Sequence, residues 1–134
     1  MARRRREPLW LSRTVIDALH SDQIREHGGL AGLRDENGLE AALARPRQKW
    51  HYDPTIDLAS LGAAYAFGLI TNHPYRDGNK RIGFLAMVTF LELHDLAFTA
   101  TDADVVAEIL AVASGRRSED ELIDWVREHS SKSS

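Results

Sequence analysis

Apolar residues recur at helical spacing along most of the chain, and polar caps and glycines mark where each run begins and ends. The first predicted helix starts after Ser12, a residue type that caps helix N-termini, and stops at Gly28 and Gly29. Five residues at mainly three- and four-residue spacings form one face: Val15, Ile16, Leu19, Gln23 and Ile24. This part of the chain therefore predicts an amphipathic helix.

A shorter run follows. Asn37 and Glu40 have the spacing of a capping box, which predicts a helix of about two turns that Pro46 closes. Residues 47–55 are polar and aromatic without a period, so we expect a surface loop. Its Trp50 and Tyr52 allow two interpretations, packing beneath the loop or lining a partner or nucleotide groove.

Two strongly apolar helices are predicted in the middle of the chain. The first begins after Asp57 and is rich in Gly and Ala, which lets neighbouring helices approach closely, so we expect it to be buried. The second covers residues 82–93 and has almost no hydrophilic face, which is typical of a central helix. A polar segment from Asn72 to Lys80 separates them.

Two further helices complete the pattern. Asp102 begins one that Gly115 ends, and Ser118 with Glu121 forms a capping box before the last. Only residues 97–101 alternate, and briefly, so we expect an all-α bundle of about six helices. We assign residues 12–129 to one helical domain, residues 1–11 to a flexible basic arm and residues 130–134 to a disordered tail.

Composition narrows the functional classes. The 134 residues have room for one domain, and a net charge of −3 argues against a protein that coats nucleic acid, so we expect no direct sequence-specific nucleic-acid binding. The chain has no Cys and no apolar leader after Arg3 to Arg6, and no apolar stretch reaches the ~18 residues of a membrane span. We therefore expect a cytoplasmic protein that does not enter a membrane.

The polar segment between the two apolar helices predicts an anion site. A helix that starts near Gly78 or Asn79 points its unpaired N–H groups and the positive end of its dipole into this segment. Lys80 and Arg81 add two cations in the first turn, where they are unfavourable for helix stability unless an anion binds. Phosphate is the expected ligand.

Two residues of this segment add reactive groups. Asp77 supplies the carboxylate that a Mg²⁺-dependent phosphoryl transfer needs, and His73 supplies an imidazole that can take a proton from an attacking hydroxyl. Tyr75 is expected to pack inward as the anchor of the loop. A polar turn without chemistry remains the simpler alternative for the segment.

At residues 73–81, His-Pro-Tyr-Arg-Asp-Gly-Asn-Lys-Arg, the chain resembles the Fic fold family and, within it, the death-on-curing (Doc) toxin branch. Residues 28–46 and the stretch from Phe98 to Trp125 agree with that branch as well. The resemblance implies that His73 is the general base, that Asp77 binds Mg²⁺, and that Gly78 and Asn79 form the anion hole, the latter with its side chain. It also implies that Lys80 and Arg81 contact phosphate.

Three positions depart from the adenylyl-transferring members of the family. Tyr75 stands where Phe is usual, Lys80 replaces a Gly, and Phe84 occupies the place of a second Arg. The last two resemble the Doc branch, which implies an ATP-dependent kinase that phosphorylates a Ser or Thr hydroxyl, with translation elongation factor Tu as the expected target. No Ser or Thr is followed four residues later by Glu, the mark of self-inhibited members, so we expect a separate antitoxin of prevents-host-death type.

Several alternatives remain open at this point. A nucleotidyl transferase would use the same pocket, and a catalytically silent module would bind a peptide in an apolar groove. We expect the walls of an antitoxin groove at Val15 and Leu19, the Trp50 loop, and Leu122 with Trp125. Arg34, Asp35 and Arg45 are interpreted as ion pairs or caps. The remaining histidines are interpreted as solvated or core-edge side chains: His20, His27, His51, His94 and His129.

Overall fold

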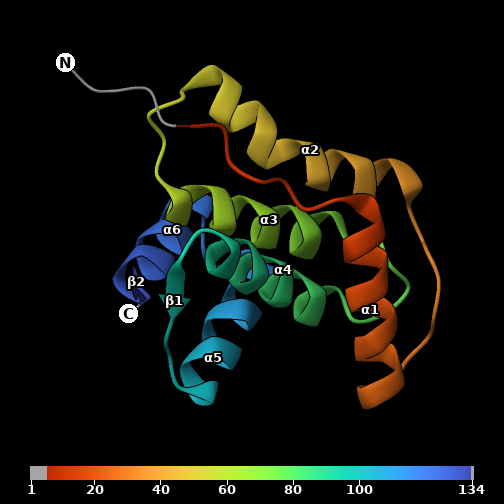
Figure 1. The fold of residues 1–134 in the computed structure, drawn as a ribbon. Coiled ribbons are helices and arrows are strands. Elements are labelled where there is room, and N and C mark those ends of the chain that lie inside the picture. The colour runs from red at the N-terminus through yellow and green to blue at the C-terminus, as the bar shows by residue number, and fades with distance from the viewer. Residues whose placement is uncertain (1–5, 134) are drawn as a thin grey trace.

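A computed structural model of the chain describes residues 6–133, which form six helices and one two-stranded sheet (Figure 1). The elements in chain order are α1 (Arg13–His27), α2 (Glu36–Tyr52), α3 (Leu58–Asn72), α4 (Asn79–Leu93), β1 (Leu96–Phe98), α5 (Asp102–Ala113), α6 (Glu119–Glu128) and β2 (Ser130–Lys132). The expected all-α bundle is confirmed. No helix in the described part of the chain is long and apolar enough to cross a membrane.

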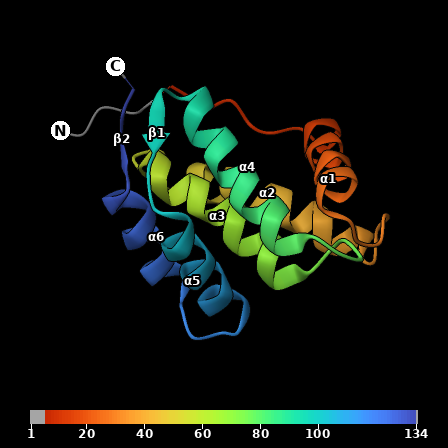
Figure 2. The ribbon, with the colours of Figure 1, turned by 90° about the horizontal axis from the view of Figure 1, so that it is seen from below.

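Helix α3 is the centre of the core, and α2, α4 and α6 pack around it (Figures 1 and 2). Small residues allow α2 and α4 to approach α3 closely. A Cβ on Gly68 would lie 3.1 Å from the Cα of Ala42 on α2, and a Cβ on Gly83 of α4 would lie 2.8 Å from a side-chain carbon of Ile70. These close approaches fix the ends of α3 and α4 that flank the polar segment.

Helix α2 differs from the sequence-based prediction. It begins one residue after Asp35, which accepts a hydrogen bond from Gly38 N at 2.9 Å, and it continues through Pro46 to Tyr52. Its buried residues recur at positions that share one face: Leu39, Ala42, Pro46 and Trp50. Burial of this face against the core outweighs the backbone hydrogen bond that Pro46 removes. The expected short helix and the loop over residues 47–52 were therefore wrong.

The chain segment before α1 belongs to the core over its last residues. The ring of Trp10 stacks on Phe90 with centroids 6.2 Å apart, and Leu11 is buried while its N–H donates to the Tyr65 hydroxyl at 2.9 Å. The flexible arm expected over residues 1–11 therefore does not extend to residues 10 and 11, because both pack against the core. The part of that expectation on residues 1–5 lies outside the described residues.

The end of the chain is also more ordered than expected. Residues 130–132 form β2, which pairs antiparallel with β1 in the register Leu96 to Lys132, and Ser133 N donates to Asp95 O at 2.9 Å. The tail therefore has a backbone partner that its own sequence, mostly Ser, does not indicate. Ser134 lies outside the described residues.

The ion pair expected at Arg45 and the capping box expected at Ser118 are confirmed, whereas the caps expected at Asn37 and Asp102 were wrong, because Asp35 caps α2 and Thr101 caps α5. Arg45 on α2 pairs with Glu119 on α6, and Lys49 lies 3.4 Å from the same carboxylate. Ser118 and Glu121 form the reciprocal capping box of α6. These contacts join α2 to the C-terminal helices.

Candidate active site

The candidate site is the loop between α3 and α4, and its backbone is held by residues 32–35. His73 ends α3 in the left-handed conformation (φ 52°, ψ 53°), and its side chain is exposed. The Arg34 side chain donates to the carbonyls of His73 (Nε, 2.7 Å) and Asn72 (Nη2, 3.0 Å). The backbone N–H groups of Arg34 and Asp35 both donate to Pro74 O. Three successive carbonyls around His73 therefore have donors, which fixes an unusual conformation for a residue other than Gly.

The N-terminus of α4 faces this loop without a side-chain cap. Gly78 is the N-cap residue in the left-handed region (φ 77°), and the first helical bond runs from Ile82 N to Gly78 O at 2.9 Å. The backbone N–H groups of Gly78, Asn79, Lys80 and Arg81 have no acceptor among the described residues. Four N–H groups at the positive end of a helix dipole fit an anion, as the sequence predicts.

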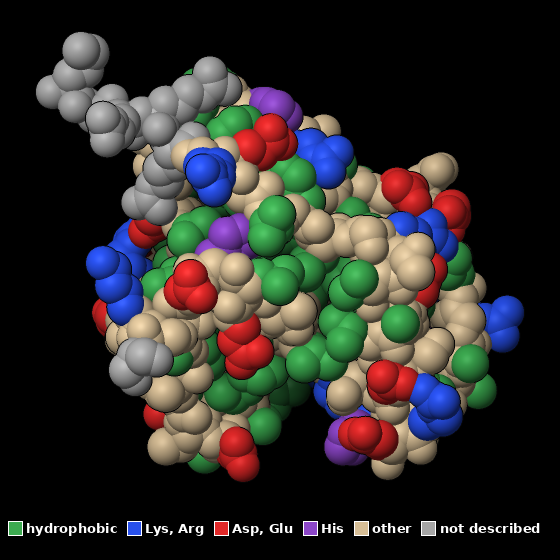
Figure 3. Space-filling model, viewed as in Figure 1, with side chains coloured by type: hydrophobic (Ala, Val, Ile, Leu, Met, Phe, Trp, Pro, Cys, Tyr) green, Lys and Arg blue, Asp and Glu red, His purple; other side chains and the backbone are tan. Residues whose placement is uncertain are grey.

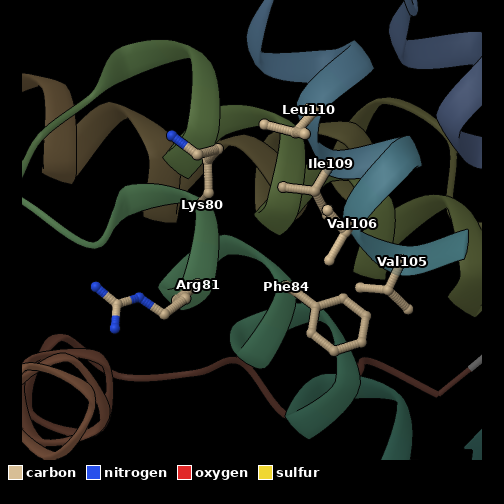
Figure 4. Close-up of a pocket in the computed structure, with 7 residues that line it drawn as sticks. All are labelled: Lys80, Arg81, Phe84, Val105, Val106, Ile109 and Leu110. Carbon is tan, nitrogen blue, oxygen red and sulfur yellow. The ribbon is translucent and has the colours of Figure 1, made fainter. Parts of the chain in front are cut away.

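Two cations stand beside these N–H groups. Lys80 is exposed and Arg81 half-buried, and neither forms an ion pair or hydrogen bond with any described residue. Both extend away from α5, whereas Phe84, one turn later, points toward it (Figure 4). The unpaired charges are available to a bound phosphate group.

An apolar hollow of about 230 Å³ adjoins the two cations, between α4 and α5 (Figure 4). Phe84 forms its α4 wall, and its ring packs edge-on against Phe98 with centroids 5.7 Å apart. The α5 wall is aliphatic and consists of Val105, Val106, Ile109 and Leu110. In space-filling view the molecule is hollowed between α5 and α1 (Figure 3).

Asp77 points one carboxylate oxygen at the preceding loop. Its Oδ2 accepts a hydrogen bond from Leu30 N at 3.0 Å, and its Oδ1 has no partner among the residues that the structure describes. Within the same residues no group of three or more His, Cys, Asp or Glu side chains is placed to hold a metal ion. These residues therefore fit Mg²⁺ only if the Asp77 carboxylate and the phosphate oxygens of a substrate bind the ion together.

Asn79 has a structural role in the loop that the sequence did not indicate. Its side chain is 3% exposed, its Oδ1 accepts from Tyr75 N and its Nδ2 donates to Tyr75 O, both at 2.9 Å. Both polar atoms therefore already bond the loop backbone, so the buried side chain holds the loop closed. Its backbone N–H, in the first turn of α4, is one of the four unpaired groups that face the loop.

Tyr75 is the expected inward anchor of the loop. The side chain is buried, and its hydroxyl donates to Asp17 Oδ1 at 2.6 Å, so the additional hydroxyl relative to Phe has its partner. Burial, followed by the hydrogen bond and the negative charge of Asp17, raises the pKa of Tyr75 above its usual range. Tyr75 therefore stays neutral and remains a donor throughout the neutral range.

His20 is a residue of the site that the sequence analysis missed. It is 3% exposed, its ring lies flat on Tyr75 with centroids 3.7 Å apart, and its Nε2 donates to Asp77 O at 2.7 Å. His20 follows Ile16, the other buried residue of α1, by four positions. That spacing was the available signal, and it places His20 on the inner face of the helix.

The expected walls of an antitoxin groove are mostly part of the core. Trp50, Leu122 and Trp125 are 9% exposed or less and offer a partner little surface, whereas Val15 on α1 is 41% exposed. Apolar side chains are also exposed beside the site on α5, where Val106 is 57% and Leu110 47% exposed, and at Leu30, which is 64% exposed. Tyr52, the other aromatic of the expected loop, is almost fully exposed at the end of α2.

Comparison with known proteins agrees with this geometry. The family model described as the Fic/DOC family matches residues 10–91, which include α1 to α3, the whole candidate loop and all but the last two residues of α4. The chain belongs to the Fic/DOC family. Its α5 and α6 lie beyond the matched residues, so the α5 wall of the hollow does too.

Two curated proteins are similar to this Fic/DOC member. "Protein kinase doc" of Escherichia phage P1 is 28% identical over 118 residues, which cover 87% of this chain and 92% of the relative. "Toxin Doc" of Mycolicibacterium smegmatis is 38% identical over 79 residues, which cover 58% of this chain and 60% of the relative. The longer alignment extends the likeness over most of the fold.

Proposed function

We propose that this protein is a toxin that transfers the γ-phosphoryl group of ATP to a Ser or Thr hydroxyl of a protein target. One observation carries the proposal: a single loop combines an exposed histidine with a helix N-terminus whose four N–H groups and two cations are unpaired. The relatives named as a kinase and as a toxin support it. Elongation factor Tu is the target that the resemblance favours.

In this reaction His73 is the general base. It takes the proton of the target hydroxyl while the hydroxyl oxygen bonds to the γ-phosphorus, and the bond from that phosphorus to the β–γ bridging oxygen breaks. ADP leaves with the electron pair of the broken bond. The backbone N–H groups of Gly78 and Asn79, with Lys80 and Arg81, bind the phosphate oxygens on which negative charge is spread.

Asp77 is the residue that would hold Mg²⁺, through the carboxylate oxygen that lacks a protein partner. When bound with ATP, the ion neutralises phosphate charge and helps to orient the phosphate chain. The bond from Leu30 N to the other oxygen orients the carboxylate before any substrate arrives.

Two side chains favour phosphoryl over adenylyl transfer. Lys80 fills the place where adenylyl-transferring members have Gly, and its exposed ammonium suits a loose phosphoryl transition state. Phe84 replaces a second Arg and is committed to apolar packing with Phe98. Adenylyl transfer by the same loop remains the second candidate function.

A separate antitoxin of prevents-host-death type is the proposed regulator. The chain lacks the Ser/Thr–Glu spacing of self-inhibited relatives, and Phe84 removes the Arg that such a Glu would bind. Control must therefore come from another molecule.

Labelled ATP tests the proposed reaction. The protein is incubated with purified elongation factor Tu, Mg²⁺ and ATP labelled at either the α or the γ phosphate, and the target is analysed by intact mass. We expect label from γ alone and the mass of one phosphate. Label from α would contradict phosphoryl transfer and support adenylyl transfer. Lys80→Gly should reduce the γ transfer, because it removes a cation from the phosphate site.

A further inference from the structure

His20 is a buried titratable side chain whose position the proposed reaction does not explain. One face of its ring stacks on Tyr75, and its edge donates through Nε2 to the carbonyl oxygen of Asp77. A carbonyl oxygen only accepts hydrogen bonds, so Nε2 carries the ring proton in this arrangement. No described residue is hydrogen bonded to the other ring nitrogen, Nδ1.

The bond from His20 acts on the peptide group that opens the anion site. Because a trans peptide is planar, its C=O and its following N–H point in opposite directions. The structure has no cis peptide among its described residues, so the Asp77 carbonyl and the Gly78 N–H belong to one trans unit. When His20 binds the carbonyl, the Gly78 N–H is directed away from α1.

That N–H has no acceptor among the described residues, and the next three N–H groups at the start of α4 are likewise unpaired. Gly78 has no Cβ to restrict its backbone, and its φ of 77° lies where glycine moves freely. Something other than the residue itself must therefore select the orientation of this peptide.

We propose that His20 is a positioning residue that fixes the peptide between Asp77 and Gly78, so that the Gly78 N–H is aimed at a bound phosphate group. Tyr75 holds the ring in place by stacking, and its bond to Asp17 ties this unit back to α1. The inference rests on the proposed use of this loop for the phosphates of ATP, and it holds for phosphoryl and adenylyl transfer alike.

Two substitutions separate positioning from packing. His20→Phe keeps an aromatic ring against Tyr75 and removes the donor, whereas His20→Gln keeps an N–H donor and removes the ring. His129→Phe is the matched control, because His129 also bonds a backbone carbonyl (Trp125 O, 2.8 Å) and packs on an aromatic ring, in the C-terminal part of the fold.

The experiment measures binding of Mg²⁺ and a non-hydrolysable ATP analogue to the full chain, with the Gly78 amide followed by two-dimensional NMR. In the unaltered protein we expect a saturable shift of this amide. His20→Phe should weaken binding about tenfold, the scale of one lost hydrogen bond, and lose most of the shift. His20→Gln should retain most of the affinity, and His129→Phe should bind as the unaltered protein does.

Two results would overturn the inference. One is a folded His20→Phe protein that binds the analogue with unchanged affinity and an unchanged Gly78 shift. The other needs no substitution and applies even if a variant fails to fold: nitrogen NMR that finds the proton of neutral His20 on Nδ1. Because binding is measured without transfer, label from the α phosphate would contradict the proposed reaction and leave this inference standing.

Discussion

At the residue scale, the site depends on side chains that bind backbone atoms of the loop. Asn79, His20 and Arg34 each donate to a carbonyl between residues 72 and 77, and none of these bonds uses a reacting group. The exposed His73 and the cations remain unpaired as a result. Preorganised backbone with unoccupied reactive groups is what positioning for transfer requires.

Arg34 gives a prediction at this scale. Arg34→Met removes the donors to the His73 and Asn72 carbonyls, so the base is held less firmly, and kcat should fall about tenfold. The KM for ATP should change little, because the Arg34 side chain bonds the backbone around His73 and none of the residues proposed to bind phosphate. Arg34→Lys, with a single ammonium, should be intermediate. Steady-state kinetics measure both constants, and a loss confined to KM would contradict this role.

At the element scale, α2 carries contacts in two directions. Its N-terminal end directly follows residues 32–35, which hold the loop between α3 and α4. In its C-terminal half, Arg45 and Lys49 pair with Glu119 of α6. Burial alone raises the pKa of Glu119, but the hydrogen bonds and charges of Arg45 and Lys49 outweigh this and lower it. The folded protein therefore favours the ionised form of Glu119 at the contact between α2 and α6.

The pH dependence of stability tests this pair. Since the pKa of Glu119 is lower in the folded than in the unfolded state, its contribution is present at neutral pH and is lost as the pH falls through that lowered pKa. Arg45→Met should lower the free energy of unfolding at pH 7 by about 1 kcal/mol. The difference from the unaltered protein should shrink as the pH falls through the acid range. Urea unfolding from pH 7 to pH 3 measures this.

The control is Arg116→Met, because Arg116 is exposed and its side chain bonds Ser114 alone among the described residues. It should leave stability and its acid dependence unchanged. An acid dependence of Arg45→Met parallel to that of the unaltered protein would show that Glu119 gains nothing from Arg45.

At the scale of the whole molecule, the proposed toxin function predicts an effect on growth, because the sequence lacks the Ser/Thr–Glu spacing of self-inhibited relatives. Expressed alone in its host, the chain should arrest growth, and His73→Ala should relieve the arrest while the protein stays folded. Removal of a general base lowers transfer by about two to three decades. Growth curves and circular dichroism measure both effects. Harmless high-level expression of the unaltered chain, with its target available, would contradict the toxin assignment and the need for an antitoxin.

Local signals in the sequence by themselves determined where most of the helices of this protein begin and end. Ser12, Asp57 and the Ser118 box begin helices as predicted, and Gly28 ends α1. The sequence also places His73, Asp77, Lys80 and Arg81 in one loop between two apolar helices, and the structure has that loop between α3 and α4. Such features depend on a few residues that are neighbours in the sequence, so they can be predicted from the sequence alone.

Tertiary structure decided the features that depend on distant partners. Burial of its inner face carries α2 through Pro46, and a partner strand orders the tail after Ser130. The side chain of Asn79 binds the backbone of its own loop, and His20 reaches that loop from 57 residues away. The roles of Pro46, the Ser-rich tail and His20 depend on the partners that packing brings to them. Burial decides the free energy of such contacts, and burial cannot be read from the neighbouring sequence.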